Sequence, residues 1–547
     1  MLFFKNKNIS ENKLLHVFIG ALYPLGFAPI NIWILTAISV SLLIYLVCEL
    51  YESNSSRNID DSKIGLRNSI ISLCFYWNLG AYGVGVSWVY VSIHEFGNAV
   101  LPLAILITGL FVLVLSVAKV IFGYLIYKLV SYCGKSMLLL IFPFAWVISE
   151  ALVSTAFNGF PWLLLGYSQI DGPLSSIATW FGVYGVGWFN VIILAALVFI
   201  IRDAFKLKES NQSIDPDIQQ RLTSQLKRNT VIILVVASFP FLNLFFESEV
   251  LNYKDKESLD VALVQPKISQ EKKWKREYFS EIIDTLYSQS EQHWDADLIV
   301  WPEGAIPAYQ HQVKDIMADL QRKLKPSRSN LLAGLPVYDK EKKVSYVGFS
   351  SIGDTSLNPP QTYYKQILVP FGEYVPLAQM LRGVIDFFNL PMSNFVPGEA
   401  NQPAISFSEY DVIPAICYEI AYPHILQNML SGADTKNNKP KIIVTVSNDA
   451  WFGDSLGPFQ HMEMARMRAL ELGVPLVRST NDGITAVVNA KGVQLTQLQR
   501  LTQDTLRFQI SLKGYNTVYR QYGYLGLYFI LGISLIFFVM ARLSRSR

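Results

Sequence analysis

Three polar side chains follow apolar, strand-forming runs of the chain, at the points where those runs end. Glu303 follows Leu-Ile-Val-Trp-Pro, Lys365 follows two tyrosines, and Cys417 follows Val-Ile-Pro-Ala-Ile. Active-site groups of α/β domains gather where strands terminate, so these positions are the first candidates for chemistry. A proline-bracketed loop after Lys365 adds one further acid, Glu373.

The three groups differ in the chemistry that each can perform. A carboxylate after a buried strand and a proline is held rigidly and partly desolvated, which raises its pKa toward values that suit a general base. An ammonium group beside aromatic residues could lie over an oxyanion. A thiol that enters a helix can be stabilised as a thiolate by the helix N-terminus and a nearby cation. Together they supply the nucleophile, base and cation of covalent acyl transfer.

Each group also has a simpler interpretation when it is taken alone. Glu303 could cap a helix or a turn, and Lys365 could be a solvated surface lysine. Cys417 could be an inert packing residue. Glu419, two residues later, could be an acid in the first turn of a helix and nothing more.

The elements that position these groups are predicted from about Leu259 to Ser511, where short β-rich runs alternate with polar, periodic segments. This pattern is typical of an α/β domain, and its length is enough for one large core. Predicted strands cover residues 260–265, 298–301, 330–334, 345–352, 412–417, 442–447, 476–479 and 484–489. Predicted helices cover residues 277–294, 313–323, 424–430 and 459–471.

The rest of the chain is apolar. Of 547 residues, 51% are hydrophobic and only 16% are charged, which indicates a polytopic membrane protein. Eight apolar runs approach membrane-spanning length, near 14–28, 32–50, 68–93, 100–128, 137–157, 177–201, 230–246 and 522–541. We therefore predict a bundle at 1–250, a catalytic domain at 258–513 and a C-terminal transmembrane helix at 519–541. The first run lacks a convincing cleavage site, which favours a retained hairpin.

Lysine and arginine alternate between the loops that join these runs. They are present before the first run and after the second, fourth and sixth, and absent around residues 29–31, 94–99 and 158–176. Because basic loops stay in the cytoplasm, the region from about residue 248 to 519 is predicted to lie outside it. A miscount of one span would invert this orientation.

Several partner classes are not expected. The net charge of +3 is small, and the basic residues are scattered, which argues against nucleic acid. Cys48, Cys74 and Cys133 lie in or beside the apolar runs, which leaves Cys417 alone in the more polar half, so no disulfide is predicted. No metal-ligand cluster is evident, and the glycines at 182–187 fall in a predicted span, so neither a metal, ATP nor acyl-CoA is implied.

The order of glutamate, lysine and cysteine at strand ends resembles the nitrilase superfamily, whose fold is a four-layer αββα sandwich. With membrane spans on both sides, the whole chain resembles the apolipoprotein N-acyltransferase family of Gram-negative bacteria. The segments that carry the resemblance are 301–307, 369–376, 416–420, 447–454 and 464–471. One departure is Tyr-Val-Gly-Phe-Ser at 346–350, where relatives often have Tyr-Asn-Ser; it puts a minor polar contact in doubt.

The resemblance implies a role for each matching residue. Cys417 would be the nucleophile, Glu303 its general base and Lys365 the cation that stabilises the tetrahedral oxyanion. The residues expected to support the site or bind substrate are Glu373, Tyr418, Glu419 and Trp274, the last in a loop near the lipid. Trp274 could equally be a simple membrane-interface anchor.

The implied activity has two halves and needs no cofactor. Cys417 would attack an acyl ester of a phospholipid, typically phosphatidylethanolamine, and keep the acyl group as a thioester. The α-amine of diacylglyceryl-cysteine in an apolipoprotein would then take it, the last step of lipoprotein maturation. The implied location is the bacterial inner membrane, with the catalytic domain on the periplasmic side. Apolar residues such as Phe371, Trp451 and Phe452 could exclude water or be ordinary core aromatics.

Two other interpretations remain at this point. A Cys-His hydrolase is possible because His424 and His461 follow Cys417, and histidine is the commoner base. A membrane sensor or channel whose outer domain has lost catalysis is the alternative from a different class.

Overall fold

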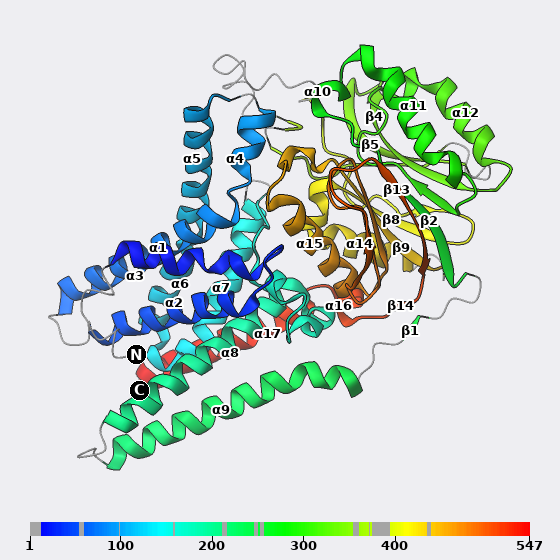
Figure 1. Ribbon diagram of the computed structural model, residues 1–547. Helices are drawn as coiled ribbons and strands as arrows, with labels where there is room; N and C mark the ends of the chain where they lie inside the picture. The colour runs from blue at the N-terminus through cyan, green and yellow to red at the C-terminus, as the bar shows by residue number, and fades with distance from the viewer. Residues whose placement is uncertain are drawn as a thin grey trace. The chain divides into compact units, whose positions relative to one another are not determined.

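The computed structural model divides into two compact units (Figure 1). The residues described are 12–53, 59–97, 99–156, 159–209, 216–245, 250–251, 256–353, 360–370, 372–374, 394–434 and 439–546. The helical unit comprises Met1–Ser87, Leu106–Glu247 and Tyr524–Arg547. The α/β unit comprises Trp88–Ile105 and Ser248–Gly523.

Long apolar helices make up the helical unit. They are α1 (Lys13–Ala21), α2 (Trp33–Ser53), α3 (Ile59–Gly85), α6 (Ile121–Cys133), α7 (Leu138–Thr155), α8 (Ala178–Glu209), α9 (Pro216–Phe245) and α17 (Leu525–Ser546), while α5 (Leu101–Lys119) begins in the other unit. Within the described residues, five helices are long and apolar enough to cross a membrane, or six if a pair bent by 60° around residue 87 counts as one span. The chain is therefore a multi-pass membrane protein.

The eight predicted apolar runs all overlap helices, but fewer helices meet the length and hydropathy of a span. Helix α1 has only 9 residues, too few to cross the roughly 30 Å hydrocarbon layer. Helix α9 carries Asp217, Arg221, Lys227 and Arg228 in its first half, so only its second half is largely apolar. These two helices account for the difference between eight predicted runs and six observed spans.

Close packing of α1 on α3 depends on two glycines. A Cβ atom on Gly20 would lie 1.8 Å from the carbonyl oxygen of Trp77, and one on Gly80 would lie 1.9 Å from that of Val17. Neither position can accept a larger residue unless the helices move apart. Small residues of this kind let apolar helices approach closely in a membrane, where no hydrophobic effect drives them together.

Two six-stranded sheets form the centre of the α/β unit. The first has the order β13-β2-β3-β4-β5-β6, with bounds Asp504–Ser511, Ser258–Gln265, Leu298–Val300, Asn330–Asp339, Val344–Ile352 and Thr362–Tyr364. The second has the order β12-β11-β10-β9-β8-β7, with bounds Gln494–Gln497, Ala486–Val488, Leu476–Thr480, Lys441–Ser447, Asp411–Ile416 and Ile405–Ser406. A short pair, β1 (Val250–Leu251) and β14 (Gly514–Tyr515), is separate.

The sheets stack face to face with helices on both outer faces, which confirms the predicted αββα sandwich (Figure 1). Helices α11 (Phe279–Ser290) and α12 (Lys314–Leu324) pack on the first sheet through a buried apolar cluster. Helices α14 (Pro423–Asp434) and α15 (Gly457–Leu472) contact the second sheet. Ser479 of β10 joins the sheets, because its hydroxyl donates to the carbonyl oxygens of Val264 and Val300 at 2.9 and 3.2 Å.

Parallel strands at the centre of each sheet bring their carboxyl ends to one edge. Strands β2, β3 and β4 run parallel, and so do β8, β9 and β10. Strand β3 ends three residues before Glu303, and β8 ends directly before Cys417. The topology therefore places the ends of two sheets, and the polar residues that follow them, in one region.

We predict that shortening a side chain in the apolar layer between α11 and the first sheet destabilises the α/β unit. Leu286 is fully buried there, so Leu286→Ala should lower the free energy of unfolding of the α/β unit by about 2–5 kcal/mol. Leu495→Ala, at an exposed position of β12, is the matched control and should change it by less than about 0.5 kcal/mol. Thermal unfolding in detergent, followed by tryptophan fluorescence, measures both. Equal melting temperatures for the two variants would contradict this packing.

Candidate active site

Glu303 lies in the turn after β3, where its carboxylate is held from two sides. Its Oε1 is 3.0 Å from the Nζ atom of Lys365. Its Oε2 accepts a hydrogen bond from the backbone N–H of Asn448 at 2.9 Å. The side chain is 12% exposed, so Glu303 is not a solvated surface acid. A fixed carboxylate beside a cation and open on one side suits proton transfer.

Lys365 follows β6 and has no exposed side-chain surface. Its Nζ lies between two carboxylates, 3.0 Å from Glu303 Oε1 and 2.5 Å from Glu373 Oε1. Burial lowers the pKa of Lys365, but the two carboxylates outweigh burial and hold the pKa well above its usual value. Lys365 is therefore a buried, permanently charged group and not a surface lysine.

Glu373 completes this ion network. Its Oε2 accepts a hydrogen bond from the backbone N–H of Val369 at 2.9 Å, which fixes the start of its own loop. Burial raises the pKa of Glu373. The charge of Lys365 lowers this pKa and the charge of Glu303 raises it, and the net shift is upward. Phe371, from the same predicted loop, lies outside the described residues.

Cys417 is the first residue after β8, and its backbone adopts a left-handed conformation with φ +52°. Such a conformation is costly for any residue with a Cβ and is found mainly at functional sites. Burial raises the pKa of the Cys417 thiol, the charge of Glu303 raises it further, and that of Lys365 lowers it. The thiol thus lies within the electrostatic reach of both groups, and the three predicted residues come together.

Of the two expected sources of thiolate stabilisation, the nearby cation is present in Lys365, but the N-terminus of an α-helix is not. Cys417 opens a turn of 3₁₀ helix, Cys417–Ala421, and not the N-terminus of a long α-helix. A single short turn has little dipole to favour an anion. Since its pKa is raised, the thiol is protonated at neutral pH, and it needs a base before it can attack.

Glu419 ties the nucleophile to the lysine segment. One carboxylate oxygen accepts hydrogen bonds from the Tyr363 hydroxyl at 3.0 Å and the Gln366 N–H at 2.5 Å, on either side of Lys365. The other accepts from the N–H of Ile416, next to Cys417, at 2.7 Å. Burial raises the pKa of Glu419 to about 7. Glu419 is thus a brace between two catalytic segments as well as an acid in a first turn.

Tyr418 and Trp274 flank the central groups. The Tyr418 ring packs edge-on against Tyr422, with 5.2 Å between centroids. Trp274 follows the short helix α10 (Gln270–Lys273) and lies beside the Glu303 turn, because a Cβ on Gly304 would be 3.7 Å from its ring. The half-buried Trp274 therefore borders the turn that carries the candidate base.

His461, on α15, contacts the backbone of Cys417 and not its thiol. The ring Nε2 is 3.0 Å from the Cys417 carbonyl oxygen, while Nδ1 is 2.9 Å from Arg478 Nη2 and 3.1 Å from an oxygen of Asp449. Burial and then Arg478 lower the pKa of His461. In the neutral ring, Nε2 donates to the carbonyl and Nδ1 accepts from Arg478, so no lone pair remains for the thiol.

That arrangement argues against a Cys-His hydrolase. His461 has both nitrogens engaged with groups other than the thiol. His424, at the start of α14, stacks edge-on to Tyr422 with 6.2 Å between ring centroids, and burial lowers its pKa. Sequence reasoning missed the cluster around His461 because its members come from three different elements: Asp449 from the turn after β9, His461 from α15 and Arg478 from the middle of β10.

An aromatic cluster of Trp88, Phe96, Trp451 and Phe452 lies beside this region. The Phe452 ring is edge-on to Trp88 at 4.7 Å and to His461 at 5.9 Å, and Trp451 is 6.1 Å from Phe96. The Ser92 hydroxyl donates to the Trp451 carbonyl oxygen at 2.7 Å, which attaches residues 88–97 to the α/β unit. These contacts give Trp451 and Phe452 partners outside the sandwich core.

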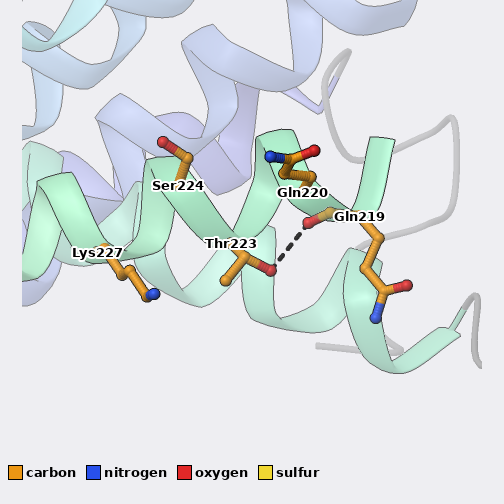
Figure 2. Close-up of a pocket in the computed structure, with 5 residues that line it drawn as sticks. All are labelled: Gln219, Gln220, Thr223, Ser224 and Lys227. Atoms are coloured by element: carbon orange, nitrogen blue, oxygen red, sulfur yellow. Dashed lines mark hydrogen bonds between the residues drawn. The ribbon is translucent and has the colours of Figure 1, made fainter. Parts of the chain in front are cut away.

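The structure also contains a pocket away from the predicted site residues. Figure 2 shows a pocket on one face of α9 in the helical unit, lined only by polar side chains: Gln219, Gln220, Thr223, Ser224 and Lys227. It holds no predicted site residue. Among the residues that the structure describes, no cluster of histidine, cysteine and acidic side chains could hold a metal ion.

Comparison with known proteins agrees with the division of the chain into a helical unit and an α/β unit. Residues 19–196 match the family model of the apolipoprotein N-acyltransferase N-terminal domain, and residues 260–520 match that of carbon-nitrogen hydrolases. An apolipoprotein N-acyltransferase of Vibrio parahaemolyticus is 34% identical and covers 96% of both chains. Those of Haemophilus influenzae (96% of this chain, 94% of the relative) and Coxiella burnetii (97% and 99%) are each 33% identical.

The protonated state of the Cys417 thiol gives a direct chemical prediction. Iodoacetamide reacts with thiolate, so alkylation of Cys417 at pH 7 should be slower than that of a free thiol of pKa about 8.5 and should still be rising above that pH. Mass spectrometry of the Cys417 peptide, with free cysteine as the reference, measures the rate. A rate that levels off below pH 8 would mean that the resting enzyme already holds a thiolate.

Proposed function

Because the chain belongs to the apolipoprotein N-acyltransferase family, we propose that it transfers a fatty acyl chain from a phospholipid to the N-terminal α-amine of diacylglyceryl-cysteine in apolipoproteins. The observation that carries the proposal is the contact of Lys365 with Glu303, within electrostatic reach of Cys417. We further propose phosphatidylethanolamine as the acyl donor and diacylated apolipoproteins as the acceptors.

In the first half-reaction, Glu303 takes the proton of the Cys417 thiol, and the thiolate attacks the carbonyl carbon of the phospholipid ester. Negative charge develops on the carbonyl oxygen, and the Lys365 ammonium stabilises it. The ester C–O bond then breaks, and Glu303 returns its proton to the departing lysophospholipid oxygen. Cys417 retains the acyl chain as a thioester.

In the second half-reaction, the neutral α-amine of the acceptor attacks the thioester carbonyl. Glu303 takes the proton that the amine loses as the C–N bond forms. The C–S bond breaks, and the Cys417 sulfur leaves as a thiolate that regains a proton from Glu303. Two transfers at one site, with one product leaving before the second substrate reacts, make a ping-pong scheme.

The surrounding residues keep these groups in place. Glu373 holds the Lys365 ammonium against Glu303, since its carboxylate lies 2.5 Å from Nζ. Glu419 ties the segments of Lys365 and Cys417 together. We assign substrate contacts to Tyr418 and Trp274, which border these residues and carry large apolar rings suited to lipid.

Water must be kept from the thioester, because hydrolysis would waste the acyl group. The aromatic cluster of Trp88, Phe96, Trp451 and Phe452 is suited to this task, since Phe452 packs on the ring that holds the Cys417 carbonyl. We propose that this cluster shields the intermediate until an amine arrives.

The alternation of basic loops supports a location in the bacterial inner membrane, with the catalytic domain on the periplasmic side. In this proposal, residues 1–250 form the N-terminal transmembrane bundle, 258–513 the catalytic domain and 519–541 the C-terminal transmembrane helix.

The identity of the base can be tested by thioester formation on phosphatidylethanolamine, detected by mass spectrometry of Cys417. Glu303→Gln should slow acylation by roughly 10²–10⁴-fold, since it removes the proton acceptor. His424→Ala is the matched control and should acylate at nearly the wild-type rate. Retained acylation in Glu303→Gln, with loss in His424→Ala, would favour a Cys-His hydrolase. Absence of an adduct on the wild-type chain with every phospholipid would favour a sensor.

Removal of one ring of the aromatic cluster should change the fate of the intermediate. Phe452→Ala is expected to raise the ratio of free fatty acid to acylated acceptor, because water then reaches the thioester. Tyr338→Ala, at an exposed position of β4, is the control. Lipid mass spectrometry after a chase with a diacylated peptide gives the ratio. An unchanged ratio in Phe452→Ala would exclude shielding by this ring.

A further inference from the structure

A second lysine, Lys273, is buried beside the candidate base and has no role in the proposed reaction steps. It is 3% exposed, and its Nζ donates a hydrogen bond to the backbone carbonyl oxygen of Glu303 at 2.9 Å. The preceding residue, Lys272, is an ordinary surface lysine that is 44% exposed and pairs with Glu281. Two adjacent lysines therefore have opposite environments, and only one is directed to the site.

The turn that carries Glu303 is shaped around Lys273. Gly304 has φ +57°, and a Cβ at this position would lie 3.3 Å from Lys273 Cε and 3.4 Å from Nζ. The glycine thus leaves room for the lysine to reach the Glu303 carbonyl. Lys365 and the Asn448 N–H hold the carboxylate of Glu303, and Lys273 holds its backbone carbonyl group. Both ends of Glu303 are therefore fixed.

The charge of Lys273 also matters to the site. Lys365 faces two carboxylates, Glu303 and Glu373, so these three groups alone carry one net negative charge. That excess charge opposes ionisation of the Cys417 thiol. Lys273 is a second cation whose charge acts on both Glu303 and Cys417, and it brings the buried set of four groups to neutrality.

The other charged group that faces Lys273 is Asp482, in the loop after β10. This loop is attached to the segment before α10, because the Lys267 N–H donates to the Asn481 carbonyl oxygen at 2.8 Å. Burial raises the pKa of Asp482 to about 6. Asp482 also interacts electrostatically with Arg500 and Lys267. Its negative charge therefore acts on three cations, of which Lys273 is one.

We propose that Lys273 is a positioning residue for acyl transfer, which fixes the backbone of Glu303 and supplies the second positive charge that allows Glu303 to take the proton of Cys417. This inference rests on the proposed function and extends it to a residue outside the three central groups. Lys273 does not have to touch the substrate, because it acts through Glu303.

Because the charge of Lys273 depends on pH, the proposal can be tested by the pH dependence of the reaction rate. Burial lowers the pKa of Lys273 to about 8, against the opposing effects of Glu303, Asp482 and Cys417. A lysine is charged below its pKa, so the charge is present at neutral pH and is lost as the pH rises through about 8. The rate of thioester formation should therefore fall on the alkaline side of the wild-type profile.

The test measures the rate of Cys417 thioester formation on phosphatidylethanolamine in detergent micelles across this pH range, for the full chain and three variants. Lys273→Met should slow the reaction and remove the alkaline fall near pH 8, since this variant has no charge at position 273 to lose there. Lys273→Arg should keep the charge and abolish the alkaline fall. Lys272→Met, the matched control, should give the wild-type profile.

The outcomes separate this inference from the proposed function. If the wild-type chain forms no thioester, the proposed function fails. If it does, and Lys273→Met only scales the rate without removing the alkaline fall, Lys273 is merely structural and the inference is overturned. Should Lys273→Met unfold, Lys273→Arg decides alone: an alkaline fall at the wild-type pH in a variant with the wild-type melting temperature would also overturn it.

Discussion

The site depends on one buried ammonium group. Lys365 has no exposed side-chain surface and lies between the carboxylates of Glu303 and Glu373. A buried charge without a partner costs several kcal/mol, so the loops that carry the two acids must close on the lysine for the unit to be stable. Folding and the assembly of the catalytic groups are in this way the same event. Loss of either acid would remove one of the two partners of the buried ammonium.

The hydrogen bonds around this ion network hold the nucleophile in an unfavourable backbone conformation. Cys417 has φ +52°, and a residue of this kind persists only where its surroundings hold it. Glu419 secures the residue before it, and His461 secures its carbonyl group. The Asp449 and Arg478 pair in turn fixes the ring of His461. The thiol is therefore positioned by its backbone and not by a base that touches the sulfur.

The sequence was sufficient for the strands and the residues at their ends, because buried strands are continuous apolar runs with a clear polar stop. The four outermost strands of the two sheets, β6, β7, β12 and β13, were not predicted. Three of them have only two to four residues, and β13 has mixed, largely exposed residues that lack a simple alternation. Lys273 was missed because it lies in the polar run Gln-Glu-Lys-Lys, which is typical of solvated helices. A thiolate beside a helix N-terminus was predicted wrongly, because sequence does not distinguish a single 3₁₀ turn from a helix start. The roles of individual site residues remain predictions.

The α/β unit is built from two separate stretches of the chain. Its larger part begins at Ser248, but Trp88–Ile105 belongs to it as well, attached through Ser92 and the rings of Trp88 and Phe96. During synthesis, this early stretch emerges long before its partner strands exist. The side chains of Trp88, Ser92 and Phe96 make these contacts only after the later sequence has folded. The α/β unit therefore cannot be separated from the helical unit by cutting the chain at one point. Any shorter chain that keeps the whole α/β unit must also keep part of the helical sequence that lies between its two stretches.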